Sequence, residues 1–160
     1  MDGPAPARYH RPMSDTASFW REAMRRGMGN TAFLHALGGE LLGFENGRGR
    51  IRLPFADHLV GNPESGVIHG GVLTALLDQA CGMAIGSALR APAMMATLDL
   101  RIDYMKPAQP QIDVLVESEC LKIAHEVAFA RAIAFQASRD EPVAIATGTF
   151  MLTPIGATPT

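Results

Sequence analysis

The longest apolar segment of the chain has the spacing of an α-helix. Apolar side chains recur every three or four positions over residues 72–85, and Pro92 follows shortly afterwards. This period predicts a long helix with one broad buried face that ends before the proline. Three residues do not fit a purely apolar core helix: Gly70 and Gly71 at its start, and Asp78 in its middle.

Much of the remaining chain alternates between apolar and polar positions. In TLDLRIDY, the apolar residues Leu98, Leu100, Ile102 and Tyr104 alternate with charged ones, which predicts a strand with one buried face. Similar segments predict two strands around a turn at Asn46-Gly47 and three more in IDVLVESECLKI, EVAFARAIAFQAS and PVAIATGTFML. Residues 30–37 predict a short helical turn, and residues 56–68 lack periodicity and predict a loop.

Two of these strands carry small side chains on one face, which lets the long helix lie close to them. They are Ala128, Ala130, Ala132 and Ala134 in one strand, and Ala144, Ala146 and Gly148 in the other. The whole pattern predicts an α+β fold in which a curved antiparallel sheet of five or six strands wraps around one long central helix.

Composition narrows the class of protein. The chain has 160 residues, 48% of them apolar, which fits a single hydrophobic core. We expect a flexible tail over residues 1–14, a helical segment over residues 15–36 and the main domain over residues 37–160. The formal net charge is −2 and both signs are interspersed, so neither nucleic acid nor a membrane surface is expected as a partner.

Cellular location and redox state follow from what the sequence lacks. The N-terminal residues contain no apolar stretch of the secretory type, so a cytoplasmic location is expected. The apolar segment 72–89 is barely long enough to span a membrane and contains Asp78, so we interpret it as a core helix. Cys81 and Cys120 form no CxxC pair, and we interpret both as reduced core thiols.

The start of the long helix is a candidate binding site. Glycines there leave the first N–H groups open, and the helix dipole adds partial positive charge. Gly70 and Gly71 are therefore suited to a phosphate, or to a carbonyl oxygen that gains charge during acyl transfer. The alternative is that the two glycines only permit close packing.

Asp78 lies eight residues beyond Gly70, which corresponds to about 12 Å along one helix. A carboxylate that far away does not reach an oxyanion at its own Gly70. Asp78 is therefore either an exposed helix residue, or it serves a site on a second subunit. In the second case it could act as a general base or as a nucleophile, and the sequence leaves both open.

Other catalytic classes find less support. His69 precedes the positive end of the helix, which disfavours a general base there and favours a structural role. The serines lack a Gly-x-Ser-x-Gly elbow, and the five histidines show no metal-ligand spacing. No metal and no other cofactor is expected.

Three segments together, GVIHGGVLTALLDQA, LDLRIDYMKPA and ATGTFMLTP, closely resemble the hotdog-fold acyl-CoA thioesterases of the phenylacetate-pathway (PaaI-like) type. The resemblance covers about residues 35–153. It implies hydrolysis of an acyl-CoA thioester to a carboxylate and free CoA. It also implies a homodimer whose sheets join edge to edge, paired into a homotetramer, with active sites at the dimer interface.

The resemblance also assigns site residues. The N–H of Gly70 would polarise the thioester carbonyl, and Asp78 of the partner subunit would act as base or nucleophile. Asn62 matches a loop residue that orients water or substrate, although it lies eight residues before Gly70 where the family has seven, so Glu64 and Ser65 are alternatives. Thr97 matches a hydroxyl residue that holds the attacking water.

Substrate contacts are expected mainly from the helix. They are assigned to His69, Gly71, Leu73 and Leu77, with Met94 and Met95 as further pocket walls. Five basic residues are available for the phosphates of coenzyme A: Arg90, Arg101, Lys106, Lys122 and Arg131.

Three functions stay open at this point. The first is hydrolysis of an acyl-CoA or of an acyl-carrier-protein thioester. The second is a module that binds acyl-CoA without cleaving it. The third is a hotdog-fold hydratase or dehydratase, which needs an acidic partner for His69.

Overall fold

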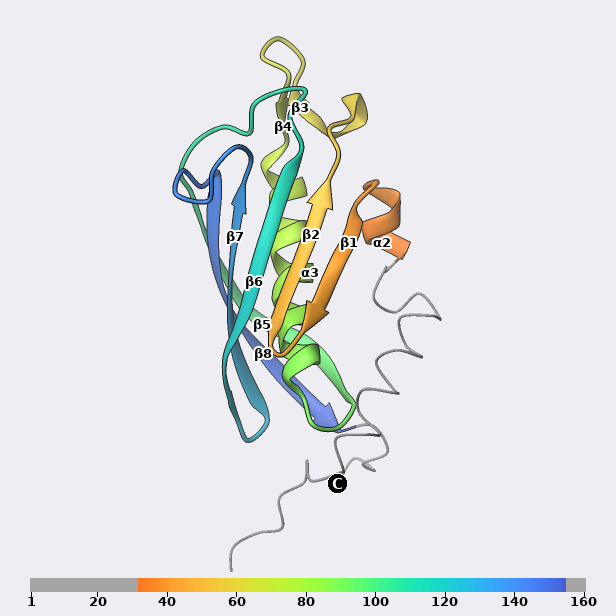
Figure 1. Cartoon of the computed structure of the whole chain (residues 1–160), viewed down its shortest axis with the longest axis vertical. Helices are drawn as coiled ribbons and strands as arrows, with labels where there is room; N and C mark the ends of the chain where they lie inside the picture. Colours follow the sequence, from red (N-terminus) through yellow and green to blue (C-terminus); the bar gives the residue numbers. More distant parts are fainter. Residues whose placement is uncertain (1–31, 155–160) are drawn as a thin grey trace, which may run out of the picture.

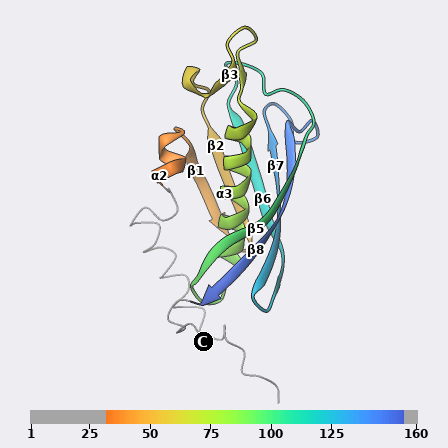
Figure 2. The same cartoon turned by 180° about the vertical axis from the view of Figure 1, so that it is seen from behind.

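The structure is a computed structural model that describes residues 32–154. One long helix, α3, lies against the concave face of an antiparallel sheet (Figure 1). From behind, the β8 and β5 side of the sheet crosses the lower end of the helix (Figure 2). The expected tail over residues 1–14 and most of the helical segment over residues 15–36 lie outside the described residues.

The sheet has six strands in the order β1-β2-β6-β7-β8-β5, all antiparallel. The predicted α+β architecture is confirmed, including the single long helix. The elements are α2 (Ala32–Ala36), β1 (Glu40–Glu45), β2 (Arg48–Leu53), β3 (Val60–Asn62), β4 (Val67–Ile68), α3 (Gly70–Ala88), β5 (Ala93–Tyr104), β6 (Val114–Ala124), β7 (Val127–Phe135) and β8 (Ala144–Pro154).

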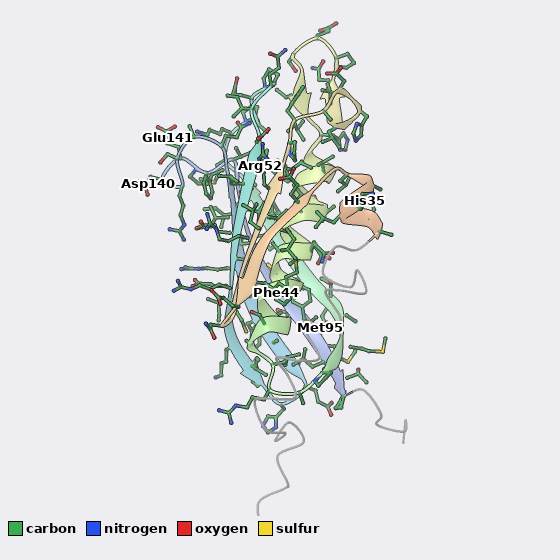
Figure 3. The ribbon with its side chains drawn as sticks, turned by 45° about the vertical axis from the view of Figure 1, so that its right-hand side comes forward. His35, Phe44, Arg52, Met95, Asp140 and Glu141 are labelled. Carbon is green, nitrogen blue, oxygen red and sulfur yellow. The ribbon has the colours of Figure 1, made fainter. Side chains whose placement is uncertain are left out.

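The first hairpin follows its turn sequence. Asn46 has φ 50° and Gly47 has φ 76°, so both turn residues adopt the left-handed conformation that Asn-Gly favours between β1 and β2. Arg52, labelled in Figure 3, lies at the far end of the hairpin and donates hydrogen bonds to Asp113 and Glu40. The Arg52 hydrogen bond lowers the pKa of Asp113. These contacts tie β1 and β2 to the chain that enters β6.

The predicted stripe of small residues lies directly under α3. Its alanines on β7 and β8 are all buried, and α3 packs against both strands. On the neighbouring strands, Gly49 and Ser118 bring the sheet still closer to the helix: Ser118 Oγ donates to the Ala80 carbonyl at 2.7 Å. The core therefore forms where the apolar face of α3 packs against a sheet surface of small side chains.

The segment 56–68 differs from its prediction as a loop. It contains a short 3-10 turn, Asp57–Leu59, and a small hairpin formed by β3 and β4. Neither was visible in the sequence because two or three residues are too few to show a period. The hairpin leads directly into α3.

The strict alternation predicted for residues 97–104 is wrong at Leu98. Thr97 pairs with Phe150 and Asp99 with Thr149, which leaves Leu98 unpaired in a β-bulge. Its side chain is 55% exposed. The extra residue shifts the alternation of the strand by one position. As a result, Thr97, which precedes the bulge, and Leu100, which follows it, both point toward the helix.

By length and composition alone, α3 would pass as a membrane span. Half of that apolar window is buried within the fold. The described part of the chain contains no other helix that passes this test. Its position under the sheet agrees with the interpretation of a core helix.

Gly49→Ala is expected to destabilise the fold by about 1 to 3 kcal/mol, because overpacking forces the helix and sheet apart. An added Cβ would lie 2.7 Å from Ser118 Oγ and 3.3 Å from the Ala80 carbonyl oxygen. Gly43→Ala on β1 is the matched control, since nothing lies within 4 Å of its Cβ position. Unfolding in denaturant measures both, and equal free energies of unfolding for the two variants would refute the close-approach argument.

Candidate active site

The N-terminus of α3 is capped by the ring of His69. Its Nδ1 accepts a hydrogen bond of 2.9 Å from the Gly71 N–H. Since Nδ1 is the acceptor, the neutral ring carries its proton on Nε2. This hydrogen bond supports the structural role predicted for His69, and it leaves the Gly71 N–H unavailable to a ligand.

The two glycines at the helix start differ in their surroundings. A Cβ on Gly71 would lie 3.0 Å from His69 Nδ1, so close packing accounts for this glycine. A Cβ on Gly70 would make ordinary contact with the Tyr104 ring, at 3.5 Å. Packing within the chain does not require a glycine at position 70. Its N–H, as the first of the helix, has no partner within residues 32–154.

The carbonyl of Gly70 is held by two hydroxyl groups that the sequence analysis did not consider. Tyr104 Oη donates to this carbonyl at 3.1 Å, and Thr74 Oγ1 lies 3.2 Å from it. The two hydroxyl oxygens are 2.7 Å apart. One signal was available: Thr74 is four residues from Gly70, on the same helix face, and Tyr104 ends the alternating strand.

Asp78 lies on the side of α3 that faces β5. Its Oδ1 accepts a hydrogen bond of 2.8 Å from Thr97 Oγ1. The structure therefore brings together two residues that the sequence analysis assigned separately. Because Thr97 occupies one carboxylate oxygen, Oδ2 is left to accept a proton or a hydrogen bond from a ligand.

Asn62 sits in the β3–β4 hairpin beside the helix start. Its Oδ1 accepts a hydrogen bond of 2.9 Å from the Glu64 N–H, which makes it part of the turn. Glu64 and Ser65, its alternatives, are exposed in the same turn. The neighbouring Gly61 lies against His69, where an added Cβ would meet the His69 Cα at 2.8 Å. The hairpin is thus packed on the residue that caps α3.

The residues expected to line a pocket have mixed positions. Leu73 and Leu77 are buried in the core of the single chain. Met95 is half-buried and Met94 is exposed, both on β5. Three of the five basic residues form surface ion pairs with carboxylates, namely Arg101 with Asp103, Lys106 with Glu141 and Arg131 with Glu119.

Cys81, one turn beyond Asp78, is not a suitable nucleophile. Burial, with a smaller contribution from the charge of Asp78, raises the pKa of its thiol to about 12. Burial also raises the pKa of Cys120. Neither forms a disulfide. Within residues 32–154, no group of three or more His, Cys, Asp and Glu side chains gathers as a metal site would require.

α3 therefore carries an open backbone donor at its N-terminus, the Gly70 N–H, and a carboxylate further along, Asp78. Together they suit attack on a carbonyl, because the donor stabilises a developing oxyanion and the carboxylate activates or replaces water. They lie about 12 Å apart along one helix.

Comparison with known proteins gives the class. The family model described as the thioesterase superfamily matches residues 65–143. The medium/long-chain acyl-CoA thioesterase YigI of Escherichia coli is 30% identical over 133 residues, which cover 75% of this chain and 84% of that protein. A putative esterase of Halobacterium salinarum is 34% identical over 88 residues, which cover 53% of this chain and 57% of that protein.

Among solved structures, a mutant of the phenylacetic acid degradation protein PaaI from Thermus thermophilus superimposes with a TM-score of 0.64. It is 30% identical, and the match covers 74% of this chain and 96% of that one. The fold is thus the hotdog fold, as the sequence resemblance implied. The chain belongs to the thioesterase superfamily and is a thioester hydrolase.

Iodoacetamide at pH 8 is expected to leave turnover unchanged, because the Cys81 thiol stays protonated far below its pKa of about 12. Cys81→Ala should also retain turnover. Mass spectrometry measures the alkylation of Cys81 in the native protein. The same measurement in denaturant, where both thiols become accessible, is the control. Rapid alkylation of native Cys81 with loss of thioester hydrolysis would show that this thiol takes part.

Proposed function

We propose that the protein hydrolyses acyl-CoA thioesters, with the Gly70 N–H as oxyanion donor and Asp78 of the partner subunit as base or nucleophile. The observation that carries the proposal is the contrast at the helix start: the Gly71 N–H is bonded to His69, whereas the Gly70 N–H is open. The Escherichia coli relative, named a medium/long-chain acyl-CoA thioesterase, supports coenzyme A as the carrier of the acyl group.

In the general-base form, Oδ2 of Asp78 accepts a proton from water as the water oxygen attacks the thioester carbonyl carbon. The carbonyl oxygen becomes an oxyanion that accepts a hydrogen bond from Gly70. When the C–S bond breaks, the thiolate of coenzyme A leaves and takes the proton from Asp78, which restores the carboxylate, and the acyl group leaves as a carboxylic acid that ionises. In the nucleophilic form, Asp78 attacks directly and water then hydrolyses the mixed anhydride. Thr97 orients the carboxylate in both forms.

Helix geometry is the reason for a second subunit. With about 12 Å between the two groups along α3, a carbonyl bound at Gly70 is out of reach of Asp78 in the same chain. On β5, Thr97 lies near the middle and Tyr104 at the C-terminal end. β5 is an edge strand with no neighbour on its free side within the described sheet. Its middle residues 96–99 are all exposed, which suits pairing with another copy.

An antiparallel pair of β5 strands would bring the two groups together. If Leu100 lies opposite its own copy, Asp99 faces the partner's Arg101, and opposite charges directly across a pair are stabilising. After the bulge is counted, Thr97 then lies opposite the partner's Ile102. That makes the partner's Tyr104 a diagonal neighbour of Thr97, at about 7 to 8 Å. Since Asp78 is bonded to Thr97 and Gly70 lies against Tyr104, Asp78 and the partner's Gly70 would flank this point. Pairing of two such dimers into a homotetramer stays a prediction.

The alternatives have less support. A hydratase or dehydratase needs an acid paired with His69. Nδ1 of His69 is occupied by the Gly71 N–H, and no carboxylate within residues 32–154 forms a hydrogen bond or ion pair with the ring. A non-catalytic binding module would not need a carboxylate held by a hydroxyl beside the open edge. Tight acyl-CoA binding without release of thiol would favour that module.

Asp78→Asn is expected to lower turnover by about a hundredfold or more, because the amide neither accepts the proton of water nor attacks a carbonyl. Release of free thiol from a panel of aryl and aliphatic acyl-CoAs measures it. Asp140→Asn is the matched control, since Asp140 is an exposed carboxylate in the turn before β8 (Figure 3). Full turnover in Asp78→Asn across the panel would overturn the proposed mechanism.

Mixed dimers test whether the two groups act across subunits. Gly70→Pro removes the open N–H at a helix position that tolerates proline, and His69 before it has the required extended backbone, φ −64° and ψ 134°. Gly70→Pro and Asp78→Asn should each be nearly inactive alone. Co-expressed under different tags, they should recover about a quarter of the parent activity, since half of the dimers would each hold one intact site.

Gly70→Ala is the companion variant, because it keeps the N–H and its Cβ makes only ordinary contact with Tyr104. Comparing Gly70→Ala with Gly70→Pro separates the effect of losing the N–H donor from the effect of losing the glycine. Mixed dimers that are no more active than their parents would place both groups in one chain and refute the shared site.

A further inference from the structure

We propose that Tyr104, together with Thr74, is a positioning residue that aims the Gly70 N–H at the substrate carbonyl. This inference rests on the proposed function, because it assigns a role to the donor named there. Tyr104 acts through the backbone, and its own contact is with the carbonyl of Gly70.

The peptide group between Gly70 and Gly71 is held at both ends. Its carbonyl oxygen accepts from Tyr104 Oη at 3.1 Å and lies 3.2 Å from Thr74 Oγ1. Its N–H donates to His69 Nδ1 at 2.9 Å. Side chains from the edge strand, from the helix and from the cap therefore fix the plane of this one peptide.

The preceding peptide carries the reactive N–H and is held less firmly. Its carbonyl, that of His69, accepts from the Val72 N–H at 2.9 Å, whereas the Gly70 N–H itself is open. Glycine has no side chain to restrict rotation about its Cα, so the direction of this N–H depends on the planes on both sides. Tyr104 and Thr74 constrain the plane on the helix side and thereby limit the rotation at Gly70.

The two hydroxyl groups have two protons for three short contacts. One hydroxyl donates to the Gly70 carbonyl, and the other donates to the first hydroxyl across their separation of 2.7 Å. If either hydroxyl is removed, the other is still able to donate to the carbonyl. The two residues are therefore partly redundant, and the loss of both should exceed the product of the single losses.

Tyr104 also couples the helix start to the proposed dimer edge. The bulge at Leu98 turns Tyr104 inward, and its ring covers the Gly70 Cα. Thr97, on the other side of the bulge, holds Asp78. One strand thus steadies the donor of its own subunit and the carboxylate that serves the partner's site.

Tyr104→Phe keeps the ring and removes only the hydroxyl. We expect kcat for thiol release to fall about fivefold with KM nearly unchanged, because a misdirected donor weakens the transition state more than substrate binding. Thr74→Val should behave in the same way and Thr74→Ser should restore turnover. The double variant Tyr104→Phe/Thr74→Val should lose about a hundredfold, more than the product of the single losses. Ser87→Ala, which removes a hydroxyl near the other end of α3, is the matched control for helix stability.

A double variant that combines Tyr104→Phe with Gly70→Pro tests whether Tyr104 acts through Gly70. Where the N–H is already absent, adding Tyr104→Phe should not lower the residual turnover further. Full additivity of the two changes, or a kcat of Tyr104→Phe equal to that of the parent, would overturn the inference. Parent-like activity of Gly70→Pro itself would instead overturn the proposed function, so the two failures are distinguishable.

Discussion

The close approach of α3 to the sheet is the packing constraint on which the other features depend. Alanines on β7 and β8, with Gly49 and Ser118 on β2 and β6, leave a surface low enough for the helix to lie directly on the strands. At this distance, side chains as short as Asp78 and Thr97 meet across the gap between helix and strand. A sheet face with larger residues would lift α3 away and break that hydrogen bond.

The direction of the helix then determines what each of its ends does. The His69 ring and the β3–β4 hairpin close the N-terminus on one side, and Tyr104 of the edge strand lies against the Cα and carbonyl of Gly70. The Gly70 N–H has no partner within residues 32–154. The C-terminal half is enclosed by the core, and this burial raises the pKa of the Cys81 thiol.

Much of this arrangement was predictable from local pattern. The helix, the Asn46-Gly47 hairpin and the stripe of small residues have clear periods or turn signals, and all were confirmed. The β3–β4 hairpin and the bulge at Leu98 were not, because each involves too few residues to form a pattern. The bulge turns both Thr97 and Tyr104 toward α3.

The sequence by itself determined the class of fold, the family and the separation of Gly70 from Asp78, because helix period, motif spacing and rise per residue are local properties of the chain. Only the tertiary structure decided which groups are engaged. It bonded the Gly71 N–H to His69, Asp78 to Thr97, and the Gly70 carbonyl to Tyr104. The last two join residues 19 and 34 positions apart, and their meeting depends on how strand and helix pack, which no local spacing encodes.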